Sequence, residues 1–193
     1  LSNLTGRQFR IVLVESADIG TVGVGEATIP AIKVFNQLCG IAETDFIRDT
    51  KATFKLGIEF ANWGQRDEQY FHAFGALGRQ WEWLSFYQYW LRARALGQAL
   101  PFEQYCVAAK MAEQYKFMPA DSSKPKSPLA EIAYAYHFDA GLYAAMLRRH
   151  SESRGVERLE GTITEVTRHA VSGHIDSLVL ADGQRVQGDL FLD

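Results

Sequence analysis

The sequence predicts an α/β fold with inserted segments, and three features of the chain predict it. A continuous apolar run at residues 11–14 is typical of a strand buried on both faces of a parallel sheet. A glycine-rich crossover and a largely helical middle part follow, and a small β-meander fills the carboxyl-terminal part. This order of elements is that of an α/β plan with insertions.

Glu15 closes the first predicted strand. An acidic residue at the carboxyl end of the second strand of a dinucleotide-binding unit usually holds a ribose hydroxyl. A solvated strand-end carboxylate explains Glu15 equally well, because the GxGxxG loop that should precede it by about 20 residues is absent from the sequence.

The glycine-rich stretch that follows, TVGVGEATIP, leads into a predicted helix over residues 29–40, with Thr28 as its N-cap and Gly40 past its end. Gly23 and Gly25 allow positive φ and a close approach of the backbone to a ligand. A plain strand-to-helix turn is the alternative interpretation of this stretch.

Residues 52–63 alternate strictly between apolar and polar side chains, which predicts one half-buried strand. Lys55 and Glu59 share its polar face, so the residues alone favour a solvated or ion-paired Lys55.

Further along, the residue pattern predicts two aromatic-rich helices, whose aromatic side chains belong to the core, and an exposed loop. A third helix and three strand-like runs follow, the last two runs joined by an Asp182-Gly183 turn. In chain order these elements cover residues 81–96, 103–113, 119–128, 140–155, 158–169, 175–182 and 184–193.

Composition describes an ordinary soluble globular chain. The 193 residues are 47% hydrophobic and 22% charged, and a net charge of -3 with both signs mixed offers no basic stripe for nucleic acid and no polybasic membrane anchor. Cys39 and Cys106 lack CxxC spacing and a nearby histidine cluster, which favours reduced structural thiols, a cytoplasmic setting and no metal site. No apolar run approaches the ~20 residues of a membrane span.

Several stretches, in this order and spacing, resemble the amino-terminal part of the flavin-dependent tryptophan halogenases: VLVES, GVGEATIP, FKLGIEFANW, FHAFG, YHFDAGLYAAML and GDLFLD. The resemblance runs across essentially the whole chain and implies a flavin-monooxygenase-like, Rossmann-type FAD-binding fold with an inserted helical block and a small β-meander. It divides the chain into a dinucleotide-fold part with a flavin strap (1–60), a substrate-side helical insertion (61–130), and a helix with the meander (131–193).

By this resemblance, the protein is an FADH2-dependent halogenase that installs chlorine or bromine on an electron-rich aromatic such as tryptophan or indole. Reduced FAD and O2 give a flavin hydroperoxide, halide attacks it, and the resulting hypohalous acid passes to a lysine that matches Lys55. The resemblance also implies substrate-binding residues, His72 and Phe74. It implies cofactor-binding residues as well: Glu15, Ser16, Gly23, Gly25, Glu26, Ala27 and Ile163.

The resemblance further implies a separate flavin reductase that supplies FADH2 by diffusion, and it leaves a homodimer open. The sequence departs from the family by lacking the GxGxxG fingerprint and the Trp-x-Trp-x-Ile-Pro segment. Leu1 and the apolar run at 188–193 lead us to expect a piece of a longer protein that is inactive in isolation. A related flavin-dependent aromatic hydroxylase and an inactive FAD-fold fragment are the alternatives.

Overall fold

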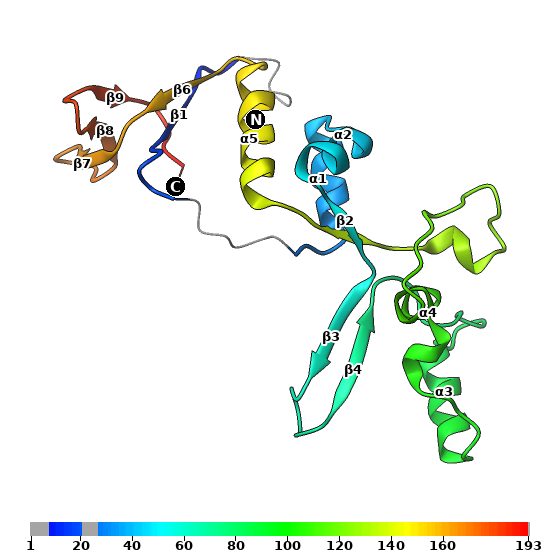
Figure 1. Ribbon diagram of the computed structural model, residues 1–193. Coiled ribbons are helices and arrows are strands. Elements are labelled where there is room, and N and C mark those ends of the chain that lie inside the picture. Colours follow the sequence, from blue (N-terminus) through cyan, green and yellow to red (C-terminus); the bar gives the residue numbers. More distant parts are fainter. Residues whose placement is uncertain (1–7, 21–26, 193) are drawn as a thin grey trace. The chain divides into compact units, whose positions relative to one another are not determined.

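The computed structural model describes residues 8–20 and 27–192 (Figure 1). The chain separates into two compact units, the first formed by residues 1–24 and 141–193 and the second by residues 25–140. Among the described residues, no helix has both the length and the apolar character needed to cross a membrane.

In the first unit, strand β1 (Ile11–Glu15) runs parallel to strand β6 (Val156–Glu160), with Glu15 opposite Glu160. The predicted first strand is therefore confirmed. Among the described residues β6 is its only ladder partner, so Leu13 stays 40% exposed instead of being buried on both faces. Because the two strands are parallel, their carboxyl ends meet at one edge.

Helix α5 (Ala140–Glu152) precedes β6, and an antiparallel meander follows it: β7 (Ile163–Arg168), β8 (Ile175–Leu180) and β9 (Arg185–Gln187). The predicted meander is confirmed, including the turn at Gly183, where φ is 87°.

Two predicted strand limits in this unit are wrong. The predicted strand over 158–169 divides between β6 and β7 at Gly161, whose amide donates to the Glu15 carbonyl oxygen at 2.9 Å. Within the described range, residues 188–192 form no strand beyond β9.

The second unit begins with helices α1 (Ala31–Cys39) and α2 (Glu43–Thr50). Gly40 ends α1 in the left-handed conformation at φ 74°, as predicted. The prediction that Thr28 is the N-cap of α1 is wrong. Pro30 occupies that position, without a side-chain hydrogen bond. The Thr28 hydroxyl instead bonds to the backbone of Tyr136.

The predicted single strand over 52–63 is two strands with different partners. Strand β2 (Thr53–Lys55) pairs antiparallel with β5 (Ala135–His137), and β3 (Gly57–Ala61) pairs antiparallel with β4 (Gln69–Ala73). Because the pairing partner changes at Leu56, the face of β2 that is buried is not the one that the alternation predicts. Phe54 is 41% exposed, whereas Lys55 is only 9% exposed, opposite to the expectation for both residues.

The helical part of this unit comprises α3 (Phe86–Ala95), η1 (Phe102–Tyr105), α4 (Val107–Glu113) and η2 (Pro128–Glu131). The predicted helix at 81–96 starts later, because Trp81 and Leu84 form a tight bridge before it. Trp81 and Trp83 are 70% and 80% exposed, so the prediction that they belong to the core is wrong. The core of this unit instead contains the fully or nearly fully buried Phe46, Ala109, Ala135 and Tyr136.

Gly57 is the position where backbone packing beside Lys55 tolerates no side chain. A Cβ built there lies 2.5 Å from the His72 carbonyl oxygen and 2.5 Å from the Phe71 ring. We therefore expect Gly57→Ala to lower the free energy of unfolding by about 1–3 kcal/mol, measured by urea denaturation. Gly20→Ala is the matched control, because nothing lies within 4 Å of its added Cβ. Equal midpoints for the two variants would contradict the packing described.

Candidate functional site

The carboxyl edge of β1 and β6 carries a charged cluster centred on Glu15. Arg148 of α5 contacts Glu15 Oε1 at 2.6 Å, and Arg158 of β6 donates to the same oxygen. Arg158 also pairs with Glu160, which accepts from the Ala17 amide at 2.6 Å. No described residue engages Glu15 Oε2, so this oxygen keeps its capacity to accept a hydrogen bond.

Hydroxyl groups lie next to this cluster. The Ser16 and Thr162 hydroxyls are 2.9 Å apart, and Ser16 Oγ accepts from the Asp18 amide at 3.3 Å. Ile163, which begins β7, is 43% exposed. A carboxylate oxygen that no described residue engages, hydroxyls and two arginines at the carboxyl edge of parallel strands fit the ribose and phosphates of a dinucleotide such as FAD.

Of the remaining predicted cofactor residues, the structure describes only Ala27. Gly23, Gly25 and Glu26 lie outside the described residues. Ala27 is exposed and forms an antiparallel bridge with His137 at the edge of β5. Thr28 then continues this contact toward Tyr136.

Lys55 has a buried side chain whose amine has no carboxylate partner in the described part of the chain. Its side chain ends 5.6 Å from the centroid of the Phe74 ring, within range of a cation–π interaction. Among the described residues no carboxylate pairs with it, and the Glu59 side chain on β3 instead accepts from Gln69. No side-chain nitrogen in the described part of the chain is both fully enclosed and without a partner, so Nζ still reaches the surface.

Of the two predicted substrate residues, the structure brings only Phe74 to Lys55. The Phe74 amide donates to the Leu56 carbonyl at 2.7 Å, which fixes its backbone beside β2, and the side chain is 9% exposed. His72 pairs with Ile58 in the β3–β4 ladder, and its side chain is exposed.

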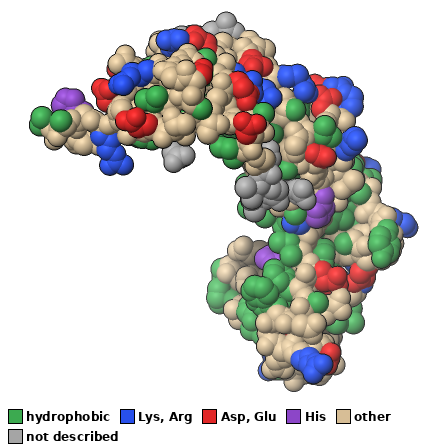
Figure 2. Space-filling view, turned by 60° about the vertical axis from the view of Figure 1, so that its left-hand side comes forward, with side chains coloured by type: hydrophobic (Ala, Val, Ile, Leu, Met, Phe, Trp, Pro, Cys, Tyr) green, Lys and Arg blue, Asp and Glu red, His purple; other side chains and the backbone are tan. Residues whose placement is uncertain are grey.

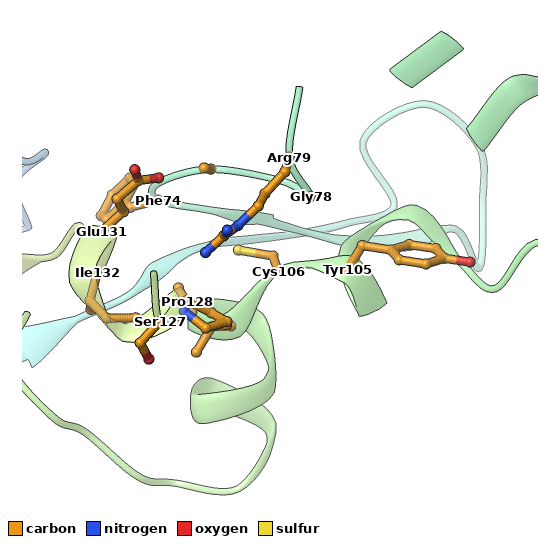
Figure 3. A pocket seen from close by; sticks show the side chains of 12 residues that line it. Phe74, Gly78, Arg79, Tyr105, Cys106, Ser127, Pro128, Glu131 and Ile132 are labelled. Carbon is orange, nitrogen blue, oxygen red and sulfur yellow. The ribbon is translucent and has the colours of Figure 1, made fainter. Parts of the chain in front are cut away.

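Phe74 also lines a cavity of about 170 Å³ in the second unit (Figure 3). The Arg79 guanidinium extends into this cavity, near the thiol of Cys106, and donates to the Lys126 carbonyl at 2.7 Å. Neither cysteine of the chain is part of a disulfide, as expected. The cavity therefore has aromatic, cationic and thiol groups on its walls.

Sequence reasoning missed a partly buried polar cluster next to β5, formed by buried tyrosines and an exposed carboxylate. Tyr134 and Tyr136 both donate their hydroxyls to Glu43 Oε1, from Tyr134 at 2.6 Å. Lys33 Nζ lies 3.9 Å from the same oxygen and 3.4 Å from the centroid of the Tyr134 ring. The i,i+2 spacing of the tyrosines in YAY, which puts both on one face of a strand, is the signal that could have found this cluster.

The titration of this cluster follows from its burial. Burial alone would raise the pKa of Glu43, but hydrogen bonds from the two tyrosines and the charge of Lys33 bring it below its ordinary value. Burial, reinforced by Glu43, raises the pKa of Tyr134 and of Tyr136 well above the ordinary value of about 10. The cluster is thus built to hold neutral phenols against one carboxylate.

On the face of the molecule shown in Figure 2, positively and negatively charged side chains are interspersed. Besides the ion pairs described above, the structure contains Arg10–Glu157 at 2.7 Å and Lys110–Glu113 at 3.0 Å.

A parallel strand pair with polar side chains at its carboxyl edge is the arrangement of nucleotide-binding α/β proteins. The chain belongs to the tryptophan halogenase family, because the sequence profile of that family matches residues 1–193. Tryptophan 7-halogenase RebH of Lentzea aerocolonigenes is 33% identical over 201 residues, which cover 95% of this chain and 36% of RebH.

Solved structures agree with this assignment. Xcc4156, a flavin-dependent halogenase from Xanthomonas campestris, is 48% identical with a TM-score of 0.89, over 100% of this chain and 38% of Xcc4156. BrvH, a flavin-dependent halogenase from Brevundimonas sp. BAL3, is 38% identical with a TM-score of 0.83, over 94% of this chain and 36% of BrvH. The chain thus has the Rossmann-like α/β fold of flavin-dependent halogenases and spans less than two fifths of their length.

The raised tyrosine pKa values predict a loss of stability at alkaline pH. Below pH about 10 the two phenols are neutral in the folded and in the unfolded chain. Above this pH they ionise in the unfolded chain but stay neutral in the folded one. The free energy of unfolding therefore falls as the pH rises. Replacing both Tyr134 and Tyr136 by Phe should reduce the loss between pH about 9 and 11 by about 1–3 kcal/mol, measured by denaturant titration at each pH. Tyr115→Phe, at a 99% exposed position, is the control and should keep the original slope. A double variant with that same slope would refute the cluster's role.

Proposed function

We propose that the protein to which this chain belongs is an FADH2-dependent halogenase that puts chlorine or bromine on an electron-rich aromatic such as tryptophan or indole. One observation carries the proposal within a family of halogenases: Lys55 is buried, no described carboxylate pairs with its amine, and that amine lies 5.6 Å from the Phe74 ring centroid. An ordinary surface lysine would be solvated or paired with a carboxylate instead.

In this proposal the first unit holds the adenosine part of FAD. Glu15 Oε2 accepts from a ribose hydroxyl, Ser16 contributes its hydroxyl, and the backbone of Ile163 contacts the adenine side. Gly23, Gly25, Glu26 and Ala27 form the strap along the flavin. When bound, the reduced flavin, delivered by a separate reductase in the cytoplasm, supplies hypohalous acid from O2 and halide.

Lys55 then acts on the hypohalous acid. Its ammonium N–H groups are not taken up by a carboxylate among the described residues, so they are available to donate to the oxygen of the acid. This contact places the halogen at one position and withdraws electrons from it. A ring carbon of the substrate attacks the halogen, the oxygen leaves with a proton as water, and the ring loses a proton to regain aromaticity. Fixing the geometry in this way can contribute several kcal/mol, of the order known for oriented reactants.

The aromatic substrate is the third component. Phe74 offers a ring face next to the amine, and stacking or edge contacts with a second ring are worth about 0.5–1.5 kcal/mol beyond area burial. His72, exposed on β4, is proposed to contact the same substrate from the hairpin.

Lys55→Met in the full-length protein should abolish halogenation while flavin oxidation by O2 stays near the original rate, because the lysine acts after the oxidant has formed. The methionine retains most of the buried stem and removes only the amine. Stopped-flow flavin spectra and mass spectrometry of the products separate the two steps. Lys116→Met, at an exposed position, is the control.

Appreciable halogenation by the Lys55→Met variant would overturn the role of Lys55. A product that carries oxygen in place of halogen, from the unaltered protein, would show an aromatic hydroxylase.

Glu15→Gln should weaken FAD binding by about 10-fold or more, because the amide loses charge-assisted bonds and no longer offsets Arg148 and Arg158. Flavin fluorescence titration of the full-length protein measures the dissociation constant. Glu157→Gln is the matched control, since it also removes an arginine pair from the β1–β6 ribbon, but at the Arg10 end. Equal affinities in the two variants would rule out Glu15 as a cofactor ligand.

A further inference from the structure

The segment Ala27–Thr28 forms a third member of the sheet that carries Lys55. Ala27 forms an antiparallel bridge with His137, and the Thr28 amide donates to the Tyr136 carbonyl at 3.1 Å. The Thr28 hydroxyl adds two bonds, donating to the same carbonyl at 2.9 Å and accepting from the Tyr136 amide at 3.2 Å. One threonine thus engages both backbone polar groups of Tyr136.

These bonds determine which edge of β5 faces Lys55. In a strand, the backbone N–H and C=O groups of alternate residues point to opposite edges. Tyr136 directs both of its groups to Thr28, so Ala135 and His137 direct theirs to β2. The ladder register agrees, with Lys55 opposite Ala135 and Thr53 opposite His137.

Side chains hold β5 itself in place. Tyr136 is 1% exposed, its ring packs 4.9 Å from that of Phe46, and its hydroxyl donates to Glu43. These contacts fix the position of β5 against α2. Strand β2 is only three residues long, so its register depends on how firmly the backbone of β5 is held.

We propose that Thr28 is a positioning residue for Lys55. Its hydroxyl binds the edge of β5 opposite β2 and fixes the backbone of Tyr136. The fixed β5 then holds β2 in the register in which the Lys55 stem is buried beside Phe74. The catalytic meaning of this position rests on the function proposed above, but the mechanical claim does not. Loss of the hydroxyl should loosen the β2–β5 pair and expose the Lys55 amine.

The test measures how fast an amine-reactive acetylating reagent modifies Lys55 in the full-length protein, relative to the exposed Lys116 in the same molecule, by peptide mass spectrometry. Thr28→Val keeps the shape and removes both hydroxyl bonds, so we expect the relative rate at Lys55 to rise about 5-fold or more. Thr28→Ser keeps the hydroxyl and should restore the original rate.

Thr164→Val is the matched control, because it removes a hydroxyl-to-carbonyl bond of 3.2 Å in the β7–β8 meander. It should leave Lys55 unchanged, whereas a rise equal to that of Thr28→Val would show general loosening and overturn the proposal. An unchanged Lys55 rate in Thr28→Val would overturn it as well.

Hydrogen exchange on the unaltered protein gives a second measurement that needs no variant. The Tyr136 amide and the Lys55 amide should open with the same free energy, since the proposal makes them one cooperative unit. Independent opening of the two amides would refute it. Whether Lys55 relays halogen is decided separately by Lys55→Met, so failure of the proposed function and failure of this inference give different results.

Discussion

The second unit depends on the pairing of strand β5 along both of its edges. A three-residue strand gains little from its own backbone, so its position comes from the tyrosine side chains that it buries against α2 and from Thr28 at its free edge. Once β5 is fixed, β2 pairs with it in the register that places Lys55 opposite Ala135, and β5 is the ladder partner of β2 among the residues that the structure describes. The short strand thus links the end of the glycine-rich stretch to the lysine that the family resemblance selects.

Local signals in the sequence predicted much of this fold, because they act within a few residues. The apolar run of β1, the left-handed Gly40 after α1 and the turn at Gly183 are each encoded by neighbouring residues, and the structure confirms them. The break at Leu56 was not predictable in this way. Strict alternation tells which residues share a face, but which face is covered depends on the partner strand, and β2 and β3 have different partners.

In the candidate sites, too, some residues are recognisable from the local sequence and others only from the fold. Glu15 was found because an acidic residue at a strand end is a local feature, whereas its partners Arg148 and Arg158 come from α5 and β6 and meet it only through the fold. Lys55 needed the family resemblance, since a lysine in an alternating run has no feature that distinguishes it from a surface lysine. The Glu43–tyrosine cluster escaped notice because its three members come from two distant segments.

Two lysines of the second unit differ in how their amines are engaged. Lys33 lies 3.4 Å from the Tyr134 ring centroid and 3.9 Å from Glu43 Oε1, so a carboxylate compensates its charge. Lys55 likewise lies near an aromatic ring, but among the described residues no carboxylate forms an ion pair with it. Because Lys55 Nζ reaches the surface, its N–H groups are left to donate to solvent or to a ligand. In the proposed function this difference selects Lys55, and not Lys33, as the group that meets a small polar oxidant.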